Sequence, residues 1–229
     1  MGIEWSTCEG YGLMDSRFDT FLRLDQEKQQ RIIKAALEEF GTKGFKAAST
    51  NAIAEAAHIG KGMLFYYFGS KEELFDFLCE YTIEFARNEF LGALSTDSND
   101  FLERLMMLSE AKRKAMAQSP EVIGFFESFY QDEQAACFEK FATEIAEVRQ
   151  LAYDKVYAGV DYTLFRDDID GKTVVTYVKW LFASYEADIM ARFKSGALDA
   201  TDDAALAAEW AKFYEFTDNL RKIFYKEAR

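Results

Sequence analysis

Apolar residues recur at steps of three and four along almost the whole chain, which is the period of an α-helix. One proline and 13 glycines among 229 residues leave long stretches without a helix breaker. The pattern therefore predicts an all-α protein. Residues 1–24 show no sustained period, and we interpret them as an N-terminal tail.

The segment after this tail is predicted to begin with one longer helix. Asp25 belongs to a residue type that caps helix N-termini, and the helix can end at Gly41 or Gly44. The apolar stripe between these signals consists of Ile32, Ile33, Ala36, Leu37 and Phe40. Its spacing places these side chains on one face, so the helix is expected to pack against a core.

Two short helices joined by a tight turn are predicted next. Ser49 is the expected N-cap of the first, over residues 50–57. Residues 58–60 form the turn and end in glycine, and the second short helix covers residues 61–67. Such a pair, resting on a longer first helix, makes a helix-turn-helix, whose second helix enters the major groove with its N-terminus first.

Longer helices are predicted beyond this unit. Ser70, with a glutamate three residues later, has the capping-box form and begins a helix that continues towards Leu94. The polar run from Ser95 to Asp100 interrupts the apolar stripe and is the expected domain seam. The remaining helices are expected over residues 101–118, from Pro120 onwards, over about 132–160, about 172–195 and about 202–226, with an acidic loop at 161–171.

The net charge of −13 runs against nucleic-acid binding, because phosphate binding normally leaves a basic footprint. The charge is distributed unevenly, however. From Arg17 to Phe75 nine Lys/Arg face eight Asp/Glu, which gives +1, and residues 1–16 carry −3, so residues 76–229 carry −11. An acidic body disfavours loose binding to DNA and leaves contact to a small local patch.

Composition argues against several other classes of protein. Three cysteines without a C-x-x-C pair suggest neither a disulfide framework nor a thiolate metal site, and they fit a cytoplasmic setting. No apolar run approaches 18 residues, so no membrane segment is expected. His58 is the only histidine, which argues against a zinc site or a Ser-His-Asp triad. Nucleotide-binding glycine motifs do not occur either, so we expect no cofactor and no enzymatic activity.

The start of the second short helix has residue types that suit DNA contact. Gly60 and Gly62 let backbone N–H groups approach a duplex, and Lys61 adds a cation at a helix N-terminus, which itself attracts phosphate. Met63 can contact a base edge such as a thymine methyl. His58 is interpreted as a turn residue rather than a ligand.

The end of the same helix is aromatic. Tyr66 and Tyr67 can donate hydroxyl hydrogen bonds to phosphates, with packing at the rim as the alternative. Lys71, at the start of the next helix, can contact the DNA backbone. The remaining apolar side chains fit core positions better than contact positions: Leu64, Phe65 and Phe68.

These segments together resemble the TetR family of transcriptional regulators. The resemblance covers about 50 of 229 residues, and the matching segments are Ile33 to Phe40, Ile53 to Ala57, Gly60 to Phe68 and Ser70 to Leu74. The chain departs from the usual family pattern at four positions. His58 replaces glycine, Gly60 a capping serine or threonine, Met63 a common threonine and Phe65 a frequent tyrosine.

The resemblance implies a homodimer with two DNA-binding heads at residues 25–74. A helical body at residues 75–229 would then hold a small-molecule pocket and a dimer interface made by its last two long helices, about 172–195 and 202–226. The DNA-contacting positions that the resemblance implies are Thr50, Gly60, Lys61, Gly62, Met63, Phe65, Tyr66, Tyr67 and Lys71.

Aromatic residues of the body are the candidate lining of an effector pocket, since such pockets commonly lie between helices. The candidates are Phe125, Phe129, Tyr153, Tyr157, Trp180 and Tyr185, and ordinary core packing is the alternative for each. The sequence thus predicts a repressor that binds a near-palindromic operator as a homodimer and is released by a small-molecule effector. The alternative is an effector-independent DNA-binding or protein-interaction regulator with a solid helical body.

Overall fold

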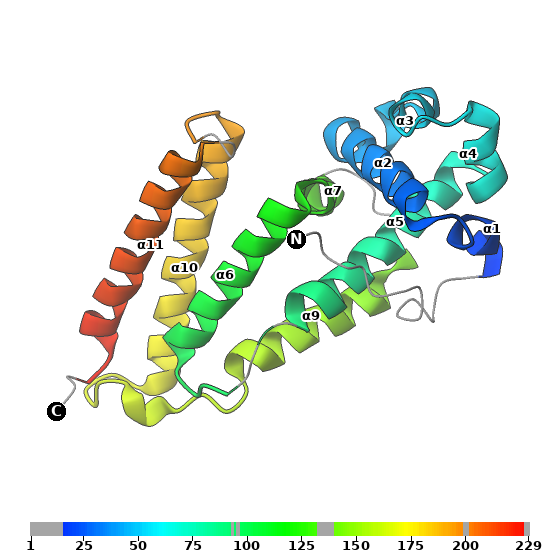
Figure 1. Ribbon diagram of the computed structural model, residues 1–229. Coiled ribbons are helices and arrows are strands. Elements are labelled where there is room, and N and C mark those ends of the chain that lie inside the picture. The colour runs from blue at the N-terminus through cyan, green and yellow to red at the C-terminus, as the bar shows by residue number, and fades with distance from the viewer. Residues whose placement is uncertain (1–15, 93, 95–96, 132–139, 199–201, 227–229) are drawn as a thin grey trace. The chain divides into compact units, whose positions relative to one another are not determined.

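A computed structural model describes residues 16–92, 94, 97–131, 140–198 and 202–226 (Figure 1). The regular secondary structure of this described part is helical and includes no β-sheet. One isolated antiparallel bridge pairs Phe165 with Tyr225. The prediction of an all-α protein is confirmed. The described α-helices are α1 Asp19–Leu22, α2 Gln26–Ala47, α3 Thr50–Ala56, α4 Lys61–Phe68, α5 Lys71–Phe85, α6 Phe101–Gln118, α7 Pro120–Gln131, α9 Ala142–Tyr157, α10 Gly171–Lys194 and α11 Asp203–Phe224.

Short polar side chains begin three of the N-terminal helices, as their sequence signals predicted. Asp25 Oδ1 accepts a hydrogen bond from the Lys28 amide at 2.9 Å and caps α2. Ser49 Oγ accepts from the Ala52 amide at 3.4 Å, and Ser70 caps α5 in the same way at 3.0 Å. Each cap satisfies an amide that has no partner within its own helix, which fixes where the helix starts.

The end of α2 shows what its two glycines do. Helix α2 continues beyond Gly41 as far as Ala47. Its helical conformation is interrupted at Gly44, whose φ is 69°. A Cβ on Gly41 would lie 3.1 Å from the Phe125 amide nitrogen, so this glycine permits close packing of α2 against α7. The prediction that either glycine could end the helix is thus wrong for Gly41 and right for the break at Gly44.

The chain divides into two compact units, residues 1–94 with 110–153 and residues 95–109 with 154–229. The break after Leu94 falls at the predicted polar seam. The apolar face of α5 stays buried in the first unit beyond residue 74, where the sequence analysis placed the end of the DNA-binding head. Phe77 is 1% exposed and Leu78 is fully buried.

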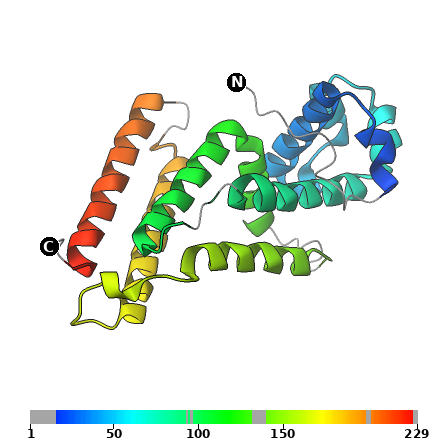
Figure 2. The same ribbon diagram turned by 60° about the horizontal axis from the view of Figure 1, so that its bottom comes forward.

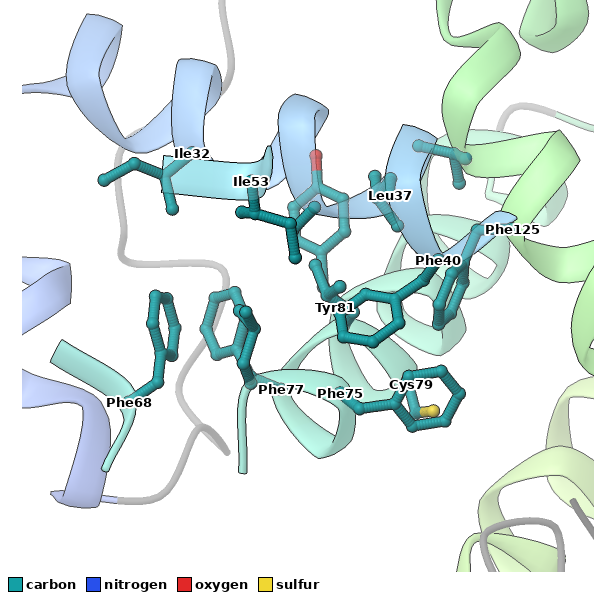
Figure 3. Close-up of a cluster of buried hydrophobic side chains, with 14 of the residues drawn as sticks. Ile32, Leu37, Phe40, Ile53, Phe68, Phe75, Phe77, Cys79, Tyr81 and Phe125 are labelled. Carbon is teal, nitrogen blue, oxygen red and sulfur yellow. The ribbon is translucent and has the colours of Figure 1, made fainter. Parts of the chain in front are cut away.

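The core of the first unit is largely aromatic (Figure 3). The ring of Phe75 lies 5.1 Å from that of Phe40 and 5.3 Å from that of Phe125, so α2, α5 and α7 meet around it. Phe77 packs against Phe68 with ring centroids 5.2 Å apart. This core supports α2, against which α3 packs, and α5, against which α4 packs.

The segment just before α2 corrects part of the predicted tail. Ser16–Phe18 forms a 3-10 turn and Asp19–Leu22 forms α1. Phe18 is 1% exposed and Phe21 is fully buried, with rings 5.1 Å from Phe77 and 4.7 Å from Phe68 respectively. The prediction of a tail is wrong from residue 16 onwards, while residues 1–15 lie outside the described part.

The second unit has its own core between α10 and α11, which run side by side in both views (Figures 1 and 2). Phe182 on α10 meets Phe213 and Phe216 on α11 at ring distances of 5.9 and 5.5 Å. Val174 and Val178 are fully buried in the same cluster. The two predicted C-terminal helices are therefore present, and their facing sides are apolar.

Candidate nucleic-acid interface

The turn between α3 and α4 is tight and includes a strained residue. The Ala57 amide donates to the Ile53 carbonyl at 2.9 Å, and the Ile59 amide donates to the Ala54 carbonyl at 2.9 Å, which closes the end of α3. His58 has a φ of 54°, in the left-handed region that favours glycine. The glycine that the TetR family usually has at this position thus fits the backbone better than the histidine found here.

Helix α4 divides into a buried face and an exposed face. Leu64, Tyr67 and Phe68 are 2%, 3% and 2% exposed, at the i, i+3 and i+4 spacing of a helix face. On the other side Met63 is 40% and Tyr66 is 67% exposed. An exposed aromatic and a thioether beside an anchored helix face are groups that can contact a groove.

The N-terminus of α4 is open. Gly60 is its N-cap and offers no side-chain hydrogen bond to the first amides. A Cβ on Gly60 or on Gly62 would meet nothing within 4 Å, so neither residue is glycine because of a close contact inside the protein. Open backbone amides at the positive end of a helix form an arrangement that binds phosphate oxygens.

Two of the predicted contact lysines lie over aromatic rings. Lys61 Nζ lies 6.0 Å from the ring centroid of Phe65, and Lys71 Nζ lies 4.9 Å from that of Phe45. Lys71 also donates to the Lys46 carbonyl at 3.4 Å. A ring orients an ammonium group without neutralising its charge, so both cations remain available to phosphate.

Two predicted contact residues differ in burial from what the sequence pattern predicted. Phe65, which the apolar pattern assigned to the core and the family resemblance to DNA contact, is 36% exposed. Tyr67 is buried, and its hydroxyl accepts a hydrogen bond from Lys28 Nζ at 3.0 Å. The i+3 step from Leu64 puts Tyr67 on the core side, so its ring belongs to the packing of α4. Thr50 is the first residue of α3 and is half-buried.

Glu39 is a positioning residue that the sequence analysis missed. Its Oε1 accepts from the Ser49 amide at 2.8 Å and from Lys43 Nζ at 2.9 Å, which ties α2 to the start of α3. Burial raises the pKa of this carboxyl, but the hydrogen bonds from Lys43 and Ser49, together with the positive charges of Lys43 and Lys71, outweigh it and hold the pKa below its usual value of 4.5. No local signal joins residues ten positions apart, so only the fold reveals this contact.

The candidate effector residues are distributed over both units. In the first unit Phe125 is 1% exposed in the core, and Tyr153 is 56% exposed. In the second, Tyr157 packs 5.5 Å from Phe101, Tyr185 stacks 4.7 Å from Phe216 and Trp180 is 62% exposed. The side chain of Phe129 lies outside the described ones. Tyr157 and Tyr185 both pack against the buried core of the second unit, whereas Tyr153 and Trp180 are mostly exposed.

Two other properties of the described part concern membranes and metals. None of its helices combines the length and apolar character needed to cross a bilayer. Within the same residues, no group of three or more His, Cys, Asp or Glu side chains is placed to hold a metal ion.

The fold and the open face of α4 define a helix-turn-helix unit of the kind that reads DNA. Comparison with known proteins specifies the family. Residues 32–77 match the sequence family described as bacterial regulatory proteins, tetR family. Over residues 32–77 the chain therefore has the sequence signature of the TetR family of bacterial transcriptional regulators, as the resemblance predicted.

Individual relatives agree with this assignment. The uncharacterized HTH-type transcriptional regulator YerO of Bacillus subtilis is 41% identical over 63 residues, which are 28% of this chain and 22% of that protein. The HTH-type transcriptional repressor NicS of Pseudomonas putida is 28% identical over 202 residues, covering 85% of this chain and 92% of NicS. A TetR family regulator from Chloroflexus aurantiacus has the same fold, with a TM-score of 0.58, 21% identity and coverage of 91% and 98%.

Replacing Lys61 with alanine is expected to weaken DNA binding on all sequences alike. Each lysine that neutralises a phosphate contributes about 0.9 to the slope of log affinity against log salt, so the slope should fall by about that amount per protomer. A salt titration on specific and random duplexes measures this. Arg23→Ala is the control, because Arg23 already faces Asp19 at 3.9 Å. An unchanged slope in Lys61→Ala would exclude the phosphate contact.

Proposed function

We propose that this protein is a ligand-responsive repressor that binds a near-palindromic operator as a homodimer and leaves the DNA when a small-molecule effector binds its helical body. The observation that carries the proposal is the open face of α4. Gly60, Gly62, Met63 and Tyr66 are exposed there, while Leu64 and its neighbours anchor the helix in the core. Exposed groups on a rigid, buried support are typical of a recognition helix.

The second unit supplies the proposed dimer interface. Large apolar side chains are exposed along α10 and α11: Trp180 at 62%, Ile223 at 50%, Tyr214 at 45%, Tyr177 at 41% and Leu181 at 40%. So many exposed apolar side chains on two adjacent helices are unusual for a surface that contacts only water. A second copy of the same two helices can cover them through a two-fold interface, in which each patch meets its own equivalent.

Such a dimer would place two copies of α4 in successive major grooves. The half-sites would then lie about 34 to 36 Å apart, or a multiple of that distance, and the operator would share the two-fold symmetry of the protein. An effector that binds one arrangement of the dimer better than another lowers DNA affinity by that difference in binding free energy. The described aromatic residues of the second unit that support an effector site are Tyr157 and Tyr185, both half-buried.

Replacing Trp180 with alanine is expected to weaken the dimer and, with it, operator binding. A buried interface tryptophan commonly contributes about 2 kcal/mol or more, so the dimer dissociation constant should rise roughly 30-fold. Analytical ultracentrifugation across a dilution series measures this constant. Tyr153→Ala is the matched control, because Tyr153 is 56% exposed but lies on α9. Equal dissociation constants for both variants would contradict the proposed interface.

The function is tested with the full chain and DNA from the region upstream of its own gene. Saturable protection of a near-palindrome, resistant to random competitor DNA, is the expected result. The same duplex then reports on effectors, because a metabolite that raises the melting temperature of the protein and releases the DNA meets both requirements. A duplex that is bound tightly and that no stabilising metabolite releases would instead favour the effector-independent regulator.

A further inference from the structure

The cations of the DNA-binding region differ in whether a carboxylate neutralises them. Nine Lys/Arg lie between Arg17 and Phe75, and the contacts of all but Lys46 divide them into two groups. Five of them have a carboxylate oxygen within 4.0 Å: Arg17, Arg23, Arg31, Lys34 and Lys43. Three others are held against aromatic rings instead, and no ion pair with a described carboxylate is found for them: Lys28, Lys61 and Lys71.

Lys61 and Lys71 are the two lysines that the family resemblance implies as DNA contacts. Lys28 shares their environment without being part of the matched motif. Its ammonium nitrogen lies 5.5 Å from the ring centroid of Tyr67 and donates to the Tyr67 hydroxyl at 3.0 Å. A long, flexible lysine side chain without a counter-ion keeps a positive charge for a partner outside the chain.

The neighbouring carboxylates are already engaged elsewhere. Asp25 uses its Oδ1 to cap α2 at the Lys28 amide, at 2.9 Å. Glu27 accepts from Arg31 Nη1 at 2.8 Å, one turn further along the helix. The ammonium group of Lys28 is thus directed towards α4 by Tyr67 and away from the acidic residues of its own helix.

The position of Lys28 complements that of Lys61. Lys61 is the first residue of α4, and Tyr67, which holds Lys28, lies in its last turn. An eight-residue helix is about 12 Å long, which is close to the width of the major groove. The Tyr67 ring is also 5.8 Å from that of Tyr66, the most exposed aromatic side chain of α4. Cations at both ends of the helix can therefore approach the phosphates on either side of a groove.

We infer that Lys28 is a further phosphate contact of this protein, positioned by the hydroxyl and ring of Tyr67. The inference rests on the proposed DNA-binding function and adds a sequence-independent contact to it. Tyr67 acts here as a positioning residue, which agrees with its burial. Its ring packs in the core, and only its hydroxyl serves the interface, through Lys28.

The first test measures salt dependence with the full-length protein. The probe is a duplex selected from a random pool by the wild-type chain, together with a scrambled duplex of equal length. Lys28→Met should reduce the slope of log affinity against log salt by about 0.9 per protomer and weaken binding roughly fivefold per protomer at about 0.15 M salt. The loss should be equal on both duplexes, because phosphates carry no sequence information.

Lys34→Met is the matched control, since Lys34 lies on the same helix with Glu38 at 3.9 Å, and its slope should stay that of the wild type. Lys28→Arg keeps the charge and should restore the slope, which loss of folding could not explain. A wild-type slope in Lys28→Met, with the selected duplex still bound, would overturn the inference and leave the proposed function intact. If the wild type selects no duplex at all, both fail.

The second test concerns Tyr67. Tyr67→Phe keeps the ring and removes the hydroxyl, so it should weaken binding about two- to threefold. The double variant Lys28→Met/Tyr67→Phe should bind as Lys28→Met does, because the hydroxyl acts through the lysine. Losses that multiply in the double variant would show that Tyr67 contacts the DNA independently and would overturn its positioning role.

Discussion

Gly62→Leu is expected to abolish specific DNA binding while leaving the fold at least as stable as before. A Cβ at Gly62 meets nothing within 4 Å, and leucine is a better helix former than glycine by about 0.8 kcal/mol, so unfolding should not become easier. The N-terminus of α4 is the end that enters the groove, and a branched side chain there holds the backbone away from the duplex. Affinity should fall at least about 100-fold, towards that of non-specific binding.

The chain offers a matched control for this substitution in Gly124. It lies inside α7, and a Cβ there also meets nothing within 4 Å. Gly124→Leu should gain similar helix stability and bind DNA as the wild type does. Chemical unfolding and a binding titration on both variants separate the two effects. Wild-type binding by Gly62→Leu would mean that the start of α4 does not approach the duplex.

The features predicted correctly from the sequence are those that act over three or four residues. Asp25, Ser49 and Ser70 each cap a helix through an amide three residues later. Such contacts need no knowledge of the rest of the fold, because the hydrogen bond closes within one turn. The same holds for the division of α4, where the spacing of Leu64 and Phe68 indicates a buried face.

The features that the sequence did not predict depend on distant partners. Phe18 and Phe21 are buried because α4 and α5 supply aromatic rings, and seven residues are too few to show a helical period of their own. Tyr67 is a residue type suited to DNA contact, but it is buried against Phe21 of α1 and bonded to Lys28, which lies 39 positions away. The local sequence pattern cannot distinguish a tyrosine that contacts DNA from a tyrosine that packs in the core.

The candidate site divides in the same way. Its motif and its glycines could be predicted because a helix-turn-helix needs a tight turn and an open helix start. The absence of a counter-ion at Lys28 within the described part could not be predicted, since it depends on which carboxylates form ion pairs with other cations. The effector residues stay a prediction, because aromatic residues fill ordinary cores as readily as pockets, and Phe125 is one that lies in a core.

Asp100 is the residue of the second unit whose removal should cost the most stability. Its carboxylate accepts from Arg221 Nη1 and from the Tyr225 hydroxyl, each at 2.7 Å, and from the Leu102 amide at 2.9 Å and the Glu103 amide at 3.2 Å. The side chain of Asp100 is 11% exposed. One carboxylate therefore caps α6 and binds both the last turn of α11 and Tyr225, which follows that helix.

Replacing Asp100 with alanine is expected to lower the free energy of unfolding by about 3 kcal/mol. The substitution removes a helix cap and leaves a buried hydroxyl and a half-buried guanidinium without their acceptor. Urea unfolding followed by circular dichroism measures the change. Asp168→Ala is the control, because its pair with Arg166 is solvent-exposed and such pairs contribute little. Equal losses in the two variants would contradict the role given to Asp100.

The same carboxylate should make stability depend on pH in a defined direction. Burial raises the pKa of Asp100, but the hydrogen bonds from Arg221, Tyr225 and the Glu103 amide outweigh it, so the pKa lies below its ordinary value of 3.8. A lowered pKa in the folded state means that the carboxylate stabilises the protein above the unfolded-state pKa, and that this stabilisation is lost as the pH falls through the folded-state pKa.

Asp100→Asn removes the titrating group, so the difference in unfolding free energy between wild type and variant should shrink as the pH is lowered from about 6 to about 3. The other carboxylates of the chain titrate in both proteins, and their contribution cancels in the difference. Urea titrations of both proteins across this range give the comparison. A difference that stays constant with pH would mean that the charge of Asp100 contributes nothing, and that only its hydrogen-bond acceptors hold the start of α6 to the C-terminal segment.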